Sequence, residues 1–263
     1  MSFLKSIQAE LIKLKFPPIL WLVGFSLCSV LGIVLISHIL DINNVVALGK
    51  NPWTKVWTAG VSIFSVFIAN PFVIMLISAA VFIEHQSNTW KYLYTTPKNR
   101  SHLFYAKLSA IILFILGTIS ILSLGLLLCG YILNFIFPEI EFSYYMPPVL
   151  KLISKFIHTV IALLGVIGIH YFLSLRFKGF LVPASFGVIA FIVGIIIGAL
   201  NKPIALYYPY TYPIVSQEHN MFRTNNVGIV DYGWLNNVEI FSIICFVFFI
   251  VLANVLEVRK QIS

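Results

Sequence analysis

Six long apolar runs, none of which contains Asp, Glu, Lys or Arg, constrain this chain more than any other feature of its sequence. A helix rises about 1.5 Å per residue, so crossing a hydrocarbon core of roughly 30 Å takes about 20 apolar residues. The runs are Ile19–Leu40, Val61–Ile83, Leu108–Phe137, Phe156–Leu175, Phe180–Leu200 and Ile240–Leu256. They predict an all-α polytopic membrane protein with six transmembrane helices.

Composition excludes a soluble globule, because 60% of the 263 residues are hydrophobic and only 10% are charged. A charge at the bilayer centre costs about 2.5 to 3.5 kcal/mol on insertion scales, which favours reading charge-free runs as spans. The first run is longer than the apolar part of a signal peptide and lacks a small-residue cleavage site after it, so we expect it to remain as an anchor. Residues 1–263 are expected to form a single transmembrane domain.

Charge distribution predicts the orientation. With the N-terminus inside, eleven of the seventeen Lys and Arg residues fall on the inner face, so the positive-inside rule places both termini in the cytoplasm. The longest connection, residues 201–239, is then an extracellular loop. The formal net charge of +8 is interpreted as an orientation signal and an attraction to anionic membrane lipids, with no nucleic acid as a partner.

Residues 1–17 have helical periodicity, which places Phe3, Ile7, Leu11 and Leu14 on one face. This pattern predicts a helix that lies at the membrane interface before Pro17 breaks it. The alternative is a frayed basic terminus that only sets the topology.

A polar, basic island separates the second and third runs, from Glu84 to Lys107. Within it, Trp90 and Tyr94 are four residues apart and share a face of a short amphipathic helix, which Pro97 ends. We expect this segment to be an exposed docking element. The alternative is that its aromatic residues belong to the interfacial aromatic belt and its cations contact lipid.

The residue order of this island resembles that of the type-2 ABC transporter permeases. These proteins typically carry an acidic residue, a Gly/Asn-Thr-hydrophobic stretch, a Pro, an Arg, and a Lys that opens the third span. The matching residues are Glu84, Asn88, Thr89, Trp90, Pro97, Arg100 and Lys107. The six-run layout is similar over the whole chain, and the closest likeness is to the small permeases grouped with lantibiotic-immunity exporters.

The resemblance implies that residues 84–107 form a cytoplasmic coupling segment, with a helix that seats in a groove of a cytosolic ABC ATPase, and that residues 1–17 form an elbow helix. The implied contact residues are Trp90, Tyr92, Leu93 and Tyr94, placed electrostatically by Lys91, Lys98 and Arg100. For Glu84 three roles stay open: an ion pair with Lys107 or Arg100, a contact with the partner, or a marker of the helix end.

No nucleotide-cradling or catalytic motif is present in the sequence, so we expect a non-enzyme that binds no cofactor and relies on ATP and Mg²⁺ held by a separate subunit. We expect His38, His158 and His170 to make helix-packing hydrogen bonds, because no acidic residue lies within a run to partner them. The three cysteines are interpreted as small packing residues.

Two further features carry open alternatives. Asn70 and Pro71 break the second run near its middle, either as a gate or as a passive kink. The aromatic stretch 207–213 lies in the last outer loop. Family resemblance suggests re-entrant or interfacial helices there, and an ordinary aromatic belt is the alternative.

Together these features predict a multi-pass permease of the bacterial plasma membrane that pairs with itself or with a sister permease around two ATPase subunits. Charge-free spans favour an amphipathic or hydrophobic cargo, such as a bacteriocin-like peptide or a lipid-like molecule. The alternative is a non-transporting scaffold or sensor that recruits a cytosolic partner through residues 84–107. A polytopic membrane enzyme ranks third.

Overall fold

Among the residues that the computed structural model describes, six helices are long and apolar enough to cross a membrane, which confirms the all-α, six-span prediction. The structure describes residues 3–40, 51–86, 100–140, 142–200, 203–216 and 229–259. The predicted coupling helix falls within residues 87–99, which lie outside the described residues.

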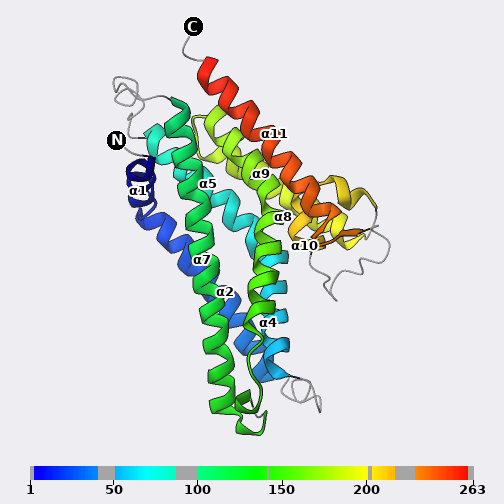
Figure 1. The fold of residues 1–263 in the computed structure, drawn as a ribbon. Coiled ribbons are helices and arrows are strands. Elements are labelled where there is room, and N and C mark those ends of the chain that lie inside the picture. Colours follow the sequence, from blue (N-terminus) through cyan, green and yellow to red (C-terminus); the bar gives the residue numbers. More distant parts are fainter. Residues whose placement is uncertain are drawn as a thin grey trace.

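Helix α1 (Phe3–Lys13) precedes the spans (Figure 1). The spans are α2 (Pro17–Leu40), α4 (Pro52–Ile63) with the π-helix η1 (Phe64–Ile68) and α5 (Ala69–Gln86), α7 (Arg100–Ile136), α8 (Val149–Arg176), α9 (Leu181–Ala199) and α11 (Asn237–Arg259). Short helices between spans are η2 (Pro138–Ile140), η3 (Phe142–Tyr144), η4 (Pro203–Tyr207), η5 (Pro209–Thr211) and α10 (Tyr212–Val215).

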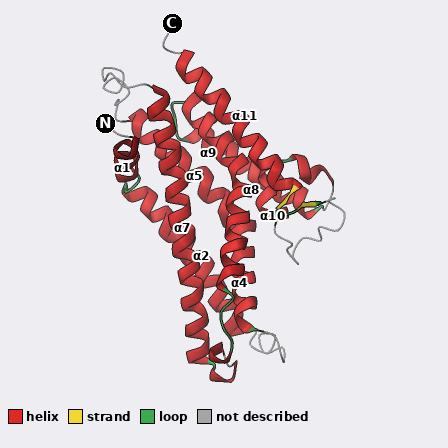
Figure 2. Cartoon of the chain, in the orientation of Figure 1, coloured by secondary structure: helices red, strands yellow, loops and turns green. Residues whose placement is uncertain are grey.

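Strand structure within the described ranges is confined to one minimal hairpin (Figure 2). Strands β1 (Asp231–Tyr232) and β2 (Leu235–Asn236) pair antiparallel. Gly233 adopts a φ of 71° in the turn, a conformation that glycine reaches without a steric penalty. The hairpin leads directly into α11, so the fold remains helical in every element that spans.

The start of α1 and the end of α11 lie toward the same end of the elongated bundle (Figure 1). The end of α5 and the start of α7, the two helix ends that flank residues 87–99, lie there too. An even number of spans returns the chain to the side from which it started. That this side is the cytoplasm stays a prediction.

The helices extend past the apolar runs at several ends. The second span begins at Pro52 rather than Val61, because Asn51 caps the helix by accepting a hydrogen bond from the Trp53 amide and Pro52 occupies the first turn. The third begins at Arg100 rather than Leu108. Hydropathy detects only the part of a helix that sits in lipid, whereas polar end turns continue into the interface.

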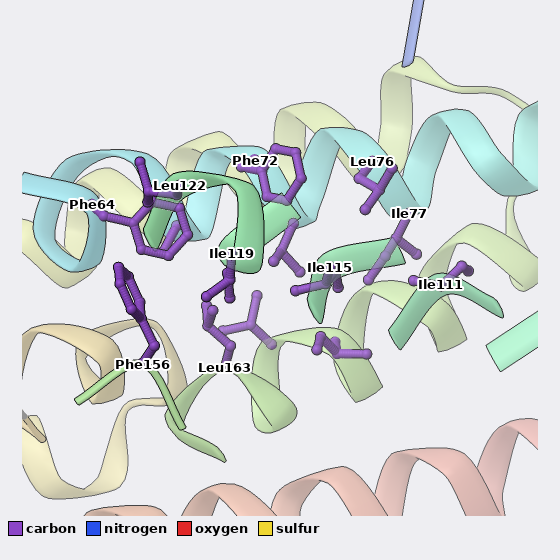
Figure 3. Packing of buried hydrophobic residues seen from close by; sticks show 14 of the residues in the cluster. Phe64, Phe72, Leu76, Ile77, Ile111, Ile115, Ile119, Leu122, Phe156 and Leu163 are labelled. Atoms are coloured by element: carbon purple, nitrogen blue, oxygen red, sulfur yellow. The ribbon is translucent and has the colours of Figure 1, made fainter. Parts of the chain in front are cut away.

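The core lies where α5, α7 and α8 meet, and Figure 3 shows its interlocking side chains. Its labelled members are all buried hydrophobic residues: Phe64, Phe72, Leu76, Ile77, Ile111, Ile115, Ile119, Leu122, Phe156 and Leu163. Lipid tails are as apolar as these side chains, so close packing rather than exclusion of water holds the helices together in a membrane.

Small residues bring α8 and α11 close together. The Gly165 amide donates a hydrogen bond to Ser242 Oγ at 2.9 Å, and a Cβ atom on Gly168 would lie 3.0 Å from the Phe246 Cα. Ser242 in turn donates to the Ile161 carbonyl. Close backbone approach with a polar tie is the usual way for transmembrane helices to associate.

Candidate coupling site

Helix α1 supplies the first part of the site, and its predicted apolar stripe packs largely against α7. Of the predicted elbow residues, Ile7 and Leu14 are buried and Leu11 is partly buried. Phe3 is more exposed, yet its ring meets the His102 ring edge-on at a centroid distance of 5.2 Å. The elbow is therefore attached to the first turns of α7, the helix that leads out of the predicted coupling segment.

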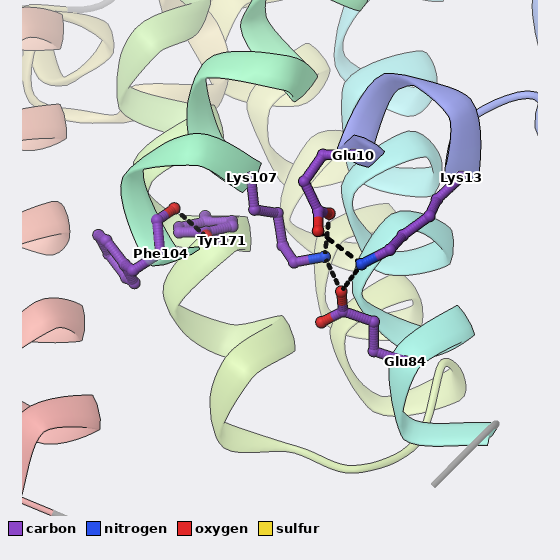
Figure 4. Close-up of polar contacts among 6 residues, drawn as sticks. All are labelled: Glu10, Lys13, Glu84, Phe104, Lys107 and Tyr171. Atoms are coloured by element: carbon purple, nitrogen blue, oxygen red, sulfur yellow. Dashed lines mark hydrogen bonds and ion pairs between the residues drawn. The ribbon is translucent and has the colours of Figure 1, made fainter. Parts of the chain in front are cut away.

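Four charged side chains meet at this end of the bundle: Glu10 and Lys13 from α1, Glu84 from α5 and Lys107 from α7 (Figure 4). Lys107 Nζ lies 2.8 Å from Glu10 Oε2 and 2.6 Å from Glu84 Oε1. Lys13 Nζ lies 2.8 Å from Glu84 Oε1 and also pairs with Glu10 Oε1. We call these four residues the charge cluster. Each carboxylate in it faces both ammonium groups.

Burial makes the pairing obligatory. The Glu84 and Lys107 side chains are 3% and 9% exposed, and a buried ion that loses its partner destabilises a protein strongly. Two acids and two bases leave the cluster neutral as a whole. Its formation therefore fixes the relative positions of α1, α5 and α7.

Lys13 is the most exposed of the four, with 37% of its side chain accessible. Partial burial lowers the pKa of its ammonium group, but Glu84 and Glu10 outweigh burial and raise that pKa above its ordinary value. A raised pKa means that the contribution of Lys13 is complete below its unfolded-state pKa and is lost only as pH rises through its folded-state pKa. Lys13 accordingly stays protonated at neutral pH.

The first turns of α7 also contact the two helices on its other side. The Tyr171 hydroxyl of α8, fully buried, donates to the Phe104 carbonyl at 2.9 Å (Figure 4). Asn254 of α11 donates to the Tyr105 hydroxyl at 3.3 Å. The first turns of α7 thus form ion pairs or hydrogen bonds with α1, α5, α8 and α11.

Several predicted site residues are placed by this geometry. Glu84 and Lys107 pair, which is one of the alternatives that the sequence left open. Arg100 begins α7. The remaining predicted coupling residues lie outside the described residues: Thr89, Trp90, Lys91, Tyr92, Leu93, Tyr94, Pro97 and Lys98.

Two members of the charge cluster, Glu10 and Lys13, were missed by sequence reasoning. Their spacing of three residues, which allows an intrahelical pair, was the available signal. It could not show that both side chains reach a second and a third helix, since that depends on how α1 folds back against α7.

One expectation about the histidines is wrong. His158 does have an acidic partner, because its Nδ1 lies 2.7 Å from Glu239 Oε1. Helix α11 starts at Asn237 rather than Ile240, which brings Glu239 inside the helix. Glu239 and Asn236 exchange backbone and side-chain hydrogen bonds in a reciprocal cap at 2.9 and 3.0 Å. His170, by contrast, makes a helix-packing hydrogen bond as expected, to the Tyr210 hydroxyl. His38 Nδ1 lies 2.8 Å from the Val34 carbonyl, one turn back on its own helix α2.

A six-span helical bundle whose elbow, second span and third span are joined at one end has the architecture of a membrane permease. Comparison with protein families agrees, because the model described as "ABC-2 family transporter protein" matches residues 6–194. The chain belongs to this family and is the membrane permease component of an ABC-2 type transporter. Searches of curated proteins and of solved structures found no match.

Family membership also indicates how transport is powered. Permeases of this family lack an ATPase of their own and typically pair with separate ABC ATPase subunits. The matched range begins within α1, includes the charge cluster and the predicted coupling segment, and ends within α9. The likeness therefore covers the charge cluster and the first turns of α7, whereas Phe3 and α11 with Asn254 lie outside it.

Proposed function

We propose that this chain is the permease subunit of an ATP-driven exporter, which moves an amphipathic or hydrophobic cargo such as a lantibiotic-like peptide or a lipid-like molecule. Two copies, or one copy and a sister permease, would assemble with two cytosolic ATPase subunits that bind ATP and Mg²⁺. The nearest relatives in function would then be exporters that protect a cell against its own antimicrobial peptide.

The observation that carries this proposal is the charge cluster. Predicted coupling residues 87–99 are joined to the bundle through α5 on one side and α7 on the other. Glu84 and Lys107 connect those two helices directly, and Glu10 and Lys13 connect both to the elbow. A displacement of the coupling segment by an ATPase would therefore move three elements together rather than bend one loop.

The cargo class follows from the apolar runs, which offer hydroxyl, amide and aromatic groups but no Asp, Glu, Lys or Arg. An inorganic ion that enters such a bundle would lose its hydration without gaining a charged partner. An amphipathic molecule can instead place its apolar part against the helices. We therefore expect ATP hydrolysis by the assembled transporter to rise with lantibiotic-like peptides or lipid analogues and not with inorganic ions.

Association with the ATPase tests the coupling role. The chain is produced together with a candidate ABC ATPase subunit and purified, as the parent protein and as Trp90→Ala and Tyr94→Ala. We expect both variants to retain little ATPase. Tyr144→Ala is the matched control, because Tyr144 is an aromatic residue with 82% exposure that lies outside the coupling segment. Unchanged ATPase binding by both coupling variants would contradict the assigned contact.

A further inference from the structure

The second span contains a turn in which the regular α-helical hydrogen-bond pattern is interrupted. Residues Phe64–Ile68 form a π-helix in which the Ala69 amide bonds to the Phe64 carbonyl, five residues back. Pro71 follows, and a proline in a helix has no amide hydrogen and its ring clashes with the carbonyl four residues earlier, here that of Phe67. The wider turn accommodates this clash. Single π-turns of this kind occur frequently at functional sites.

A short segment between the last two spans packs directly beside this π-helical turn. We call residues 203–216 the tyrosine segment; it comprises η4, η5 and α10. Tyr210, Thr211 and Tyr212 are at most 3% exposed, whereas Tyr207 is 73% exposed. The alternative of a simple interfacial aromatic belt therefore does not describe the buried half of this segment.

Tyr210 is held by three spans at once. Asn70 of α5 donates from Nδ2 to the Tyr210 carbonyl at 2.8 Å. His170 Nε2 of α8 lies 2.9 Å from the Tyr210 hydroxyl. On α9, a Cβ atom on Gly194 would lie 3.1 Å from the Tyr210 Cβ, so the glycine provides the space that this residue occupies. Tyr208, by comparison, hydrogen bonds through its hydroxyl to the Ala190 carbonyl of α9.

Hydrogen bonding around Tyr210 is incomplete. Within the described part of the chain, Asn70 Oδ1 and His170 Nδ1 are buried and have no hydrogen-bond partner. Buried polar atoms without partners raise the free energy of the arrangement that contains them. The contact is therefore specific in geometry, but two of its buried polar atoms make no hydrogen bond. Such a contact suits an interaction that forms and breaks.

Helix α5 connects this contact to the charge cluster. Asn70 and Glu84 stand near opposite ends of α5, separated by about 20 Å at 1.5 Å per residue. A displacement of Glu84 together with the coupling segment would pass along α5 to its other end. There the π-helix allows α5 to move relative to α4.

From these contacts we propose that Tyr210 is a latch that closes the bundle between α5 and α9, with Asn70 and His170 as its positioning residues. In the closed state Asn70 holds the Tyr210 carbonyl. When the ATPase subunits draw α5 away at the π-helix, that bond breaks and the tyrosine segment separates from the second span. The inference rests on the proposed function, because the ATPase supplies the displacement.

Labelling of a buried cysteine tests the latch. Val215, 2% exposed, is replaced by cysteine in a background without Cys28, Cys129 and Cys245, and its rate of modification by a maleimide is measured in vesicles. Without nucleotide, we expect Asn70→Leu to raise the rate about 5- to 10-fold, the factor that loss of one hydrogen bond of about 1 kcal/mol or slightly more produces. Leucine keeps the size of the side chain, so the variant is expected to fold.

Tyr210→Phe removes only the hydroxyl and is expected to raise the rate similarly. Tyr208→Phe is the matched control and should leave the rate unchanged, since its hydroxyl contacts α9 alone. Unchanged rates in folded Asn70→Leu and Tyr210→Phe would overturn the proposal, and so would an equal rise in Tyr208→Phe. These rates are measured on the chain alone, so failure of the latch is distinct from failure to bind an ATPase.

The response of the latch to ATP tests its connection to transport. In the assembled complex, trapping the nucleotide state with vanadate should raise the labelling rate of the parent protein and leave that of Asn70→Leu almost unchanged. A purely structural role would lower the melting temperature of Asn70→Leu without removing this nucleotide response. An undiminished response in Asn70→Leu would therefore overturn the latch even if ATPase binding is intact.

Discussion

Lys107 and Lys13 bind the same two carboxylates but differ in exposure, at 9% and 37% of their side chains. Removing Lys107 leaves buried Glu84 and Glu10 with one partially hydrated cation between them. A broken buried ion pair typically costs about 3 to 5 kcal/mol, whereas a surface pair contributes about 1 kcal/mol or less. The two lysines are therefore expected to be unequal in stability.

We expect Lys107→Met to lower the thermal unfolding temperature of the detergent-solubilised protein far more than Lys13→Met. Lys5→Met serves as the control, because Lys5 is an exposed residue on the same helix as Lys13. Scanning fluorimetry measures all three. Equal losses for Lys107→Met and Lys13→Met would show that the cluster is not buried as described.

The sequence shows which charged residues lie near the helix ends, but it predicts only some of the residues with which they pair. The pair Glu84–Lys107 was among the alternatives, because an acid that ends one span and a base that opens the next are close whenever the intervening segment is short. Hydropathy excludes Glu239 from the last apolar run and predicts that it lies in a loop. Only the geometry of the helix cap shows that it is buried and faces His158.

At the scale of elements, the contact between α4 and α7 depends on a glycine. A Cβ atom on Gly130 would lie 2.3 Å from Trp53 Cζ3, and the Trp53 indole is itself fixed by donating to the Phe142 carbonyl at 3.0 Å. Gly117 lies on the same helix with open space around it. Alanine substitutions at the two glycines therefore distinguish the effect of side-chain packing from the effect of helix propensity.

We expect Gly130→Ala to destabilise the protein by about 1 to 3 kcal/mol through overpacking. Gly117→Ala should be neutral or stabilising, because alanine is the better helix former by about 1 kcal/mol. Unfolding temperatures of the two variants, compared with the parent protein, measure the difference. A stable Gly130→Ala would mean that α4 and α7 are less closely packed than described.

The existence of each span could be predicted from sequence, but several of the ends could not. Asn51 and Pro52 form a helix start that lies nine residues before the apolar run it serves, and such polar turns contribute nothing to a hydropathy signal. Pro71 marked the second span as irregular. The π-helix then falls on the preceding turn, where the Phe67 carbonyl opposes the proline ring.

At the scale of the whole molecule, six charge-free runs were sufficient to predict the architecture, because in lipid the backbone must satisfy its own hydrogen bonds and a helix is the simplest way to do so. Burial of the tyrosine segment against α5, α8 and α9 could not be predicted in the same way. Its aromatic residues fit a belt and a buried segment equally well.

Orientation is a whole-molecule prediction that labelling can check. Single cysteines at Ser87 and Asn226, in a background without the native cysteines, are expected to react with an impermeant maleimide from opposite sides of the membrane. The expectation follows from the number of spans between them, and the excess of Lys and Arg predicts that Ser87 faces the cytoplasm. Labelling of both positions from one side would contradict the six-span topology.

We propose that this permease transports only with work delivered through residues 84–107 by a separate ATPase. Vesicles containing the permease alone, the permease with its ATPase, or the Trp90→Ala permease with that ATPase are given ATP and a fluorescent amphipathic peptide, and peptide movement is followed. We expect movement only with the unaltered permease and ATPase together. Movement at the same rate by the permease alone, in vesicles free of nucleotide, would contradict the claim.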